Sequence, residues 1–190
     1  MKKFMSVAAL VLVCVMLFGC GAQKPAGGEN PSTQPSTQPS TQPAPSAPAG
    51  EVGQLGTDLF GKLPELPIGL MNMPVDLTDA EGTKFLTGIT DPALVKEAMI
   101  WEPMTGAQAY SLLLVRVNDS AKAQEVAQQM YDNIDTRKWI CVEADTKTAA
   151  YCGDLVVFFM VDSKLEIHTT QLVEDAFKEL CGGTIDGVIG

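Results

Sequence analysis

Two short apolar segments place the strongest constraint on what this chain can fold into. SLLLV (111–115) after its first serine, and LVVFFMV (155–161) throughout, are apolar at both odd and even positions. Because successive side chains of a strand point to opposite faces, a strand with one wet face would alternate apolar and polar residues. These segments are therefore strands covered on both faces, or strands whose uncovered face meets another molecule.

The helices predicted near these strands leave that choice open, because there are only three and all are short. We expect the helices at 119–136 and 170–181 to cover one face of the sheet. The other face is then covered only in part, and such an apolar patch is typical of a contact with a protein partner or a second copy of the chain. Within LVVFFMV, Phe158 lies on one of these faces and Phe159 on the other.

The wider pattern of apolar residues predicts a single α+β domain at 51–190. Its first helix begins near Thr78, where Glu81 completes a capping-box spacing. The order helix, two strands, helix, two strands, helix predicts a four-stranded antiparallel sheet with helices packed mainly on one face. The predicted strands are 95–104, 109–117, 138–145 and 151–161, the later helices are 119–136 and 170–181, and the segments 63–74 and 181–190 are expected to be irregular.

Residues 20–50 are predicted to form a disordered tether ahead of that domain. They contain three copies of Pro-Ser-Thr-Gln, beginning at Pro31, Pro35 and Pro39. Proline at every fourth position fixes φ and removes a donor, and the residues between have little to bury. Such a tract is a semi-rigid spacer, rising about 3.1 Å per residue where it is extended.

The first 19 residues have the order of an export signal. Lys2 and Lys3 precede an uncharged run, Phe4 to Phe18, that is shorter than the roughly 20 residues needed to cross a bilayer. The run ends in Leu-Phe-Gly-Cys, residues 17–20, which resembles the lipobox of bacterial lipoproteins. The resemblance implies cleavage before Cys20 and a lipid on its sulfur, where two acyl chains give durable attachment. An ordinary signal peptide or a single anchor helix is the alternative.

The charge of the chain argues against nucleic acid as a partner. Its 13 basic and 23 acidic residues give a net charge of −10. Loss of Lys2 and Lys3 with the signal would shift that value to −12. An acidic surface without a basic run repels phosphates and anionic head groups. We therefore expect the only membrane contact to be the lipid on Cys20, at the extracellular face of the cytoplasmic membrane.

Two cysteines are candidates for a disulfide. Cys141 and Cys152 lie on predicted strands that would pair about a turn near 146–148, which would place them opposite or nearly opposite each other. A shift of one residue in that turn would send the two side chains to opposite faces. The alternatives are two buried free thiols or, least favoured, a redox-active pair, and Cys181 is expected to be a packed thiol.

The sequence predicts no catalytic, cofactor-binding or metal-binding residues. His168 is the only histidine, and just before the last predicted helix it is expected at the surface or in a cap. A nucleophile with its base, or a zinc site, needs several groups at suitable spacing. The acidic pairs on the predicted helices are typical of solvated faces.

The domain also resembles a family. The stretch ALVKEAMIWEPMTGAQAYSLLLVRVNDSAKAQEVAQQMYDNID, followed by YCGDLVVFFMVDS, is similar to a group of uncharacterised Gram-positive lipoproteins classed as a domain of unknown function. The similarity spans about residues 70–181 and implies no catalytic residues. The sequence thus predicts a lipid-anchored, non-catalytic binding or accessory module of the cell envelope. The alternative is an enzyme that acts on cell-envelope material.

Overall fold

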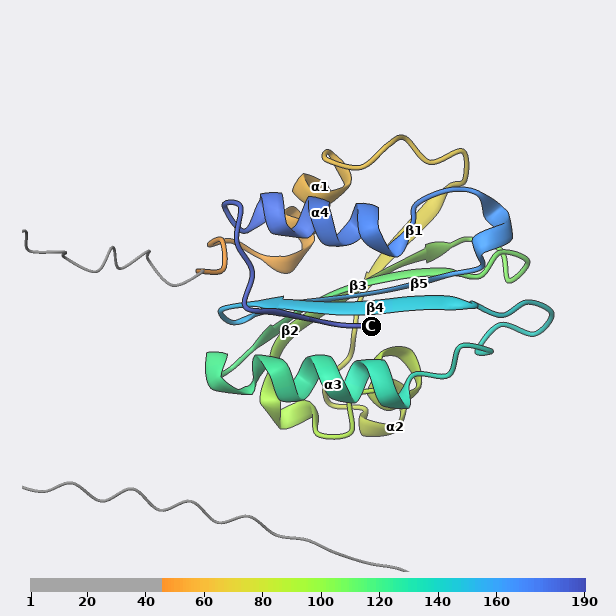
Figure 1. The fold of residues 1–190 in the computed structure, drawn as a ribbon. Helices are drawn as coiled ribbons and strands as arrows, with labels where there is room; N and C mark the ends of the chain where they lie inside the picture. The colour runs from red at the N-terminus through yellow and green to blue at the C-terminus, as the bar shows by residue number, and fades with distance from the viewer. Residues whose placement is uncertain (1–45) are drawn as a thin grey trace, which may run out of the picture. The chain divides into compact units, whose positions relative to one another are not determined.

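The computed structural model describes residues 46–190. The predicted signal, Cys20 and the repeats of the tether lie outside the described residues. Within them, the chain forms a six-stranded, fully antiparallel sheet with helices on both sides (Figure 1). The elements, in chain order, are α1 (Val52–Phe60), β1 (Leu70–Pro74), α2 (Ala80–Thr87), η1 (Pro92–Leu94), β2 (Val95–Pro103), β3 (Tyr110–Val117), η2 (Ser120–Lys122), α3 (Ala123–Asn133), β4 (Thr146–Cys152), β5 (Leu155–Val161), η3 (Ser163–Leu165), α4 (Thr170–Leu180) and β6 (Gly187–Ile189).

The α+β class with an antiparallel sheet is confirmed, and the prediction of four strands is wrong. The strand order is β1-β2-β3-β5-β4-β6. Two strands that the sequence analysis did not predict lie at the edges, β1 against β2 and β6 against β4. They come from the segments 63–74 and 181–190, which were expected to be irregular. Such short edge strands depend on the backbone of a neighbour, so their own residue pattern is weak.

Helix ends follow local capping chemistry. The Asp79 side chain accepts a hydrogen bond from the Gly82 amide and caps α2, so the cap is one residue later than the predicted Thr78. Gly88, at φ 77°, ends that helix in the left-handed conformation that glycine adopts without strain. In α4, the hydroxyl of Thr169 accepts from the Leu172 amide.

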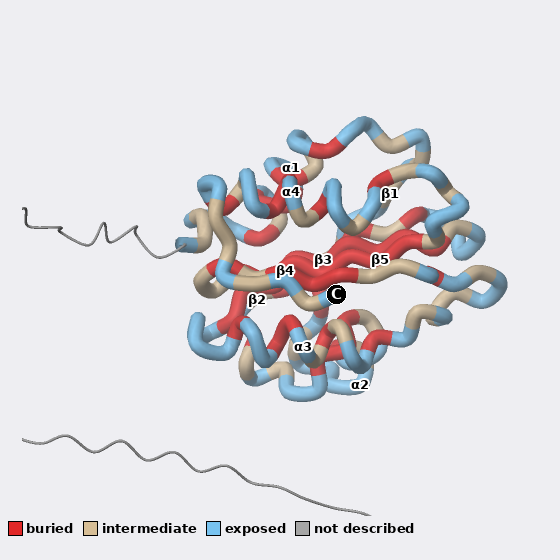
Figure 2. The backbone as a smooth tube through the Cα atoms, in the orientation of Figure 1, coloured by how far each residue is buried: buried red, intermediate tan, exposed pale blue. Residues whose placement is uncertain are grey.

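Helices cover both faces of the sheet, so the prediction that one face is covered only in part is wrong. Figure 1 shows α2 and α3 on one side and α1 and α4 on the other. Every residue of the central strands β3 and β5 is buried, as Figure 2 shows in red. Phe158 and Phe159 both have no exposed surface. The helix α1, which the sequence analysis missed, supplies part of this cover; its buried residues recur at 52, 55, 56 and 59, which is helical spacing.

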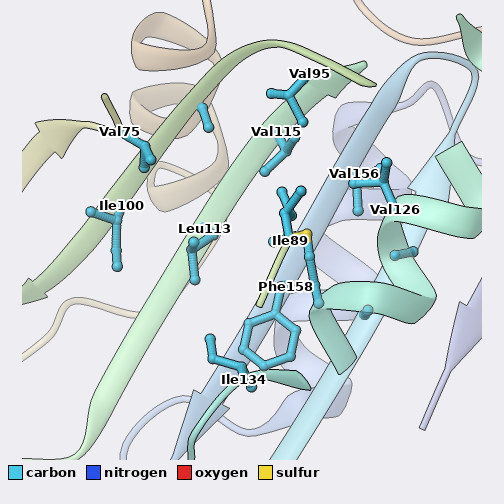
Figure 3. Packing of buried hydrophobic residues seen from close by; sticks show 14 of the residues in the cluster. Val75, Ile89, Val95, Ile100, Leu113, Val115, Val126, Ile134, Val156 and Phe158 are labelled. Atoms are coloured by element: carbon cyan, nitrogen blue, oxygen red, sulfur yellow. The ribbon is translucent and has the colours of Figure 1, made fainter. Parts of the chain in front are cut away.

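We call the two cores the α2–α3 layer and the α1–α4 layer. The first contains Phe158, Leu113, Val115 and Ile134, and Figure 3 shows the Phe158 ring beside Ile134. In the second, Phe159 packs with residues of α1 and α4. Here α1 approaches very closely, because a Cβ at Gly56 would lie 2.0 Å from the Trp101 ring. Adjacent residues of one strand thus fill two separate cores.

The hairpin that ends at LVVFFMV differs from the predicted one. Residues 138–145 form no strand, and β4 begins at Thr146. Cys152 pairs with Leu155, which leaves a two-residue turn at Gly153 and Asp154. Gly153 has φ 56°, and a Gly at this first turn position is typical of a type II′ hairpin. The Gly-Asp pair lies inside an apolar run, which is why the turn was placed too early.

The packed chain begins ahead of residue 51. Arg116 of β3 forms an ion pair of 2.6 Å with Asp154. Its second guanidinium nitrogen donates to the carbonyls of Pro48 and Gly50, at 2.9 and 3.1 Å. These contacts hold residues 48–50, at the end of the predicted tether, against the sheet.

Candidate functional site

A pocket of about 470 Å³ lies beside residues 137–145. These residues form the irregular segment that connects α3 to β4 in the chain. One wall comes from this segment and the other from the chain after β5. Its lining combines apolar side chains with charges of both signs: Arg137, Trp139, Ile140, Cys141, Val142, Glu143, Asp145, Asp162 and Lys164.

Polar contacts fix the rim of this pocket. The Asp145 carboxylate accepts hydrogen bonds from the Ser163 amide at 2.8 Å and from its hydroxyl at 2.6 Å. These bonds hold the pKa of Asp145 below its usual value, so it stays ionised. Arg137 and Glu143 form an exposed ion pair of 3.2 Å. Ile140 is 99% exposed and offers apolar area directly to solvent.

The structure does not bring the predicted disulfide partners together. Cys141 is exposed at the pocket, Cys152 is buried at the far end of β4, and both are free thiols. Cys152 instead shares its core with Cys181, at the end of α4, and its Sγ lies 3.8 Å from the Thr184 carbonyl oxygen. Sequence reasoning missed this pair, although the turn at Gly153 would have placed Cys152 at the end of its strand.

The only histidine is in the core, so its expected surface or cap position is wrong. His168 is 3% exposed. Its Nδ1 lies 2.9 Å from the Tyr110 hydroxyl and its Nε2 lies 2.7 Å from the Pro64 carbonyl. A carbonyl only accepts, so Nε2 carries the proton and Nδ1 accepts from Tyr110. Burial lowers the pKa of His168 and raises that of Tyr110, so both stay neutral at pH 7.

A serine and a lysine also meet in the core. Lys138 Nζ donates a hydrogen bond to Ser111 Oγ at 3.2 Å. The same nitrogen forms an ion pair of 2.5 Å with Glu102 Oε1. The angles at Glu102 Oε1 do not fit a hydrogen bond, so this contact is an ion pair only. A nucleophilic serine needs an adjacent base and access to substrate. Ser111 has no exposed surface and the Lys138 side chain is 3% exposed. Burial lowers the pKa of Lys138 and the Glu102 carboxylate opposes that change. The cluster attaches the 137–145 segment to β2 and β3.

Across residues 46–190, no three His, Cys, Asp or Glu side chains gather as ligands for a metal ion. In the same range no helix combines the length and apolar character needed to cross a membrane.

Comparisons with known proteins give no relative for this chain. No protein-family model, no curated protein and no solved structure matches it.

Proposed function

We propose that the protein is a lipid-anchored lipoprotein on the extracellular face of the cytoplasmic membrane, whose folded domain is a non-catalytic binding or accessory module. The observation that carries the proposal is the sequence Leu-Phe-Gly-Cys at 17–20, directly after a cationic start and an uncharged run. The proline-rich repeats that follow suit a spacer between the lipid and the domain.

The described domain supports binding over catalysis. Its histidine has both ring nitrogens occupied within the core, and its serine–lysine contact has no solvent access. The pocket beside 137–145 gathers apolar side chains and charges of both signs at the surface, among them Ile140, Arg137 and Asp162. We therefore place the binding surface of the module at this pocket. The resemblance to uncharacterised Gram-positive lipoproteins is part of the proposal and rests on the residues quoted above.

Replacement of Cys20 tests the anchor. Cells that express the Cys20→Ser variant are fed an alkyne fatty acid, and the chain is followed by fluorescence and by separation of membranes after an alkaline wash. We expect no label, with release of the chain or retention of an uncleaved precursor, because serine lacks the sulfur that takes the lipid.

Cys14 provides a matched control, because it is the other cysteine of the N-terminal segment. The Cys14→Ser variant is expected to be labelled, cleaved and membrane-bound like the parent chain. A Cys20→Ser chain that is cleaved, labelled and still bound to membranes would contradict the proposed anchor.

A further inference from the structure

The strongest unassigned chemical feature of the domain is a pair of buried cysteines in the same core, where the end of β4 lies beside the chain that follows α4. Cys152 is the last residue of β4, and Cys181 directly follows α4. Both belong to the α1–α4 layer, with exposures of 0% and 6%. Each thiol affects the pKa of the other: Cys181 lowers that of Cys152, and Cys152 raises that of Cys181. Independently, Cys152 Sγ lies 3.8 Å from the carbonyl oxygen of Thr184, three residues beyond Cys181.

The surrounding backbone fixes the position of both residues. Cys152 lies within the register of β4 and β5, opposite Leu155. The chain after Cys181 is held by two hydrogen bonds: the Asp186 amide donates to the Tyr151 carbonyl at 2.9 Å, and the Gly153 amide donates to the Asp186 carboxylate at 2.6 Å. Tyr151 and Gly153 are the neighbours of Cys152 in the chain, so these bonds hold the segment that follows Cys181 beside the end of β4.

We propose that Cys152 and Cys181 are a disulfide-forming pair that joins the sheet to the end of α4. Formation of the Sγ–Sγ bond removes two protons and two electrons from the thiols. The acceptor is a protein or small-molecule disulfide, whose own S–S bond is reduced to two thiols. That the bond forms in the cell rests on the proposed export, because disulfides persist mainly outside the cytoplasm.

Burial determines when this bond forms. Burial raises the pKa of both thiols, and the negative charge of Asp186 raises both pKa values further. The thiolate is the attacking species, so the folded domain reacts slowly. We therefore expect the bond to form before α4 docks on the sheet, and to resist reductant once the layer has closed.

Refolding gives a direct test, with residues 21–190, which contain the whole described domain. The reduced chain is unfolded, refolded in a glutathione redox buffer, alkylated under denaturing conditions and digested with trypsin. Cleavage after lysine places Cys141, Cys152 and Cys181 in separate peptides: 139–147, 148–164 and 179–190. We expect the second and third peptides to be linked and the first to be alkylated. Alkylation of all three, or a link to 139–147, would overturn the pair.

Thermal unfolding is the second readout. A bond that closes a 29-residue separation limits the unfolded chain, so the oxidised chain is expected to melt about 5–15 °C above the reduced one. Cys181→Ser removes this difference, and Cys141→Ser, the matched control, retains it. Equal melting temperatures of the oxidised and reduced parent chain would overturn the assignment, because a strained link does not stabilise the native fold.

A measurement in intact cells distinguishes a failure of this proposal from a failure of the proposed export. The full chain is trapped with acid in intact cells, alkylated and digested in the same way. Linked peptides support both proposals. Reduced thiols in cells, together with linked peptides after refolding, support the pair and count against an oxidising location outside the cytoplasm.

Discussion

Tyr110 and Ser111 are neighbours on β3, yet they begin two different kinds of polar cluster on opposite faces of the sheet. In the α1–α4 layer, Tyr110 donates to His168, and both groups are neutral. In the α2–α3 layer, Ser111 accepts from Lys138, whose charge is paired with Glu102. The first cluster holds the chain at Pro64 and the second holds the 137–145 segment. The same task, attaching an irregular segment to the central strand, is thus done once with neutral groups and once with charges.

A charged substitution in the apolar part of either layer is expected to lower the stability of the chain by a similar amount. This is the largest effect that we predict. Phe158→Asp and Phe159→Asp each bury a carboxylate in a core where the parent side chain has no exposed surface. A loss of more than about 4 kcal/mol is expected for each, a large part of the roughly 5–15 kcal/mol that stabilises such a domain. Circular dichroism and thermal unfolding measure it. A Phe158→Asp or Phe159→Asp chain that melts like the parent chain would show that its layer is not a true core.

Breaking the ion pair is expected to have the next largest effect. Glu102→Gln leaves the Lys138 charge, 3% exposed, without its counter-charge, and loss of one partner of a buried pair costs about 3–5 kcal/mol. The double variant Lys138→Met with Glu102→Leu is expected to recover most of that loss, because it leaves no buried charge. Urea unfolding of the three chains measures the difference. A double variant as unstable as Glu102→Gln would contradict this account.

The neutral cluster is expected to respond to pH, with a smaller effect. The pKa of His168 in the folded chain lies below its ordinary value of 6.5, so the unfolded chain binds the proton more readily. Stability is therefore full above pH 6.5 and is lost as the pH falls below it. The melting temperature is expected to decrease from pH 7 to pH 5, and His168→Gln is expected to flatten this slope.

The charged cluster provides the control for that measurement. The Lys138→Met, Glu102→Leu chain is expected to keep the slope, because it leaves His168 and its contacts with Tyr110 and Pro64 unchanged. The carboxyls of Asp76 and Asp145 have pKa values below 3.8 and titrate outside this window. A parent chain with a flat profile from pH 7 to pH 5 would contradict the neutral pair of His168 and Tyr110.

The sequence was sufficient to predict the elements that bury the most apolar area. SLLLV and LVVFFMV became β3 and β5, and the apolar spacing of 119–136 and 170–181 became α3 and α4. Their strong patterns follow from burial on both faces of a strand or along one face of a helix. The edge strands β1 and β6 lack such a pattern, since a short edge strand is defined by its neighbour's backbone.

The polar contacts were less predictable, because their partners are distant in sequence. Pro64 and His168 are 104 residues apart, and Lys138 lies 27 residues from Ser111. No local pattern relates such residues. The sequence analysis paired Cys152 with Cys141 because it placed the turn near 146–148. That error moved the whole register of β4, so the proximity of Cys152 to Cys181 was missed.

The hold of Arg116 on residues 48–50 has a mechanical consequence. A pulling force on the chain ahead of Pro48 passes through two hydrogen bonds to Arg116 before it reaches α1. Arg116 belongs to β3, in the interior of the sheet, and is braced by Asp154 at the β4–β5 turn. The interior strands of the sheet therefore carry the force. It reaches α1 only after the hydrogen bonds between Arg116 and residues 48–50 break.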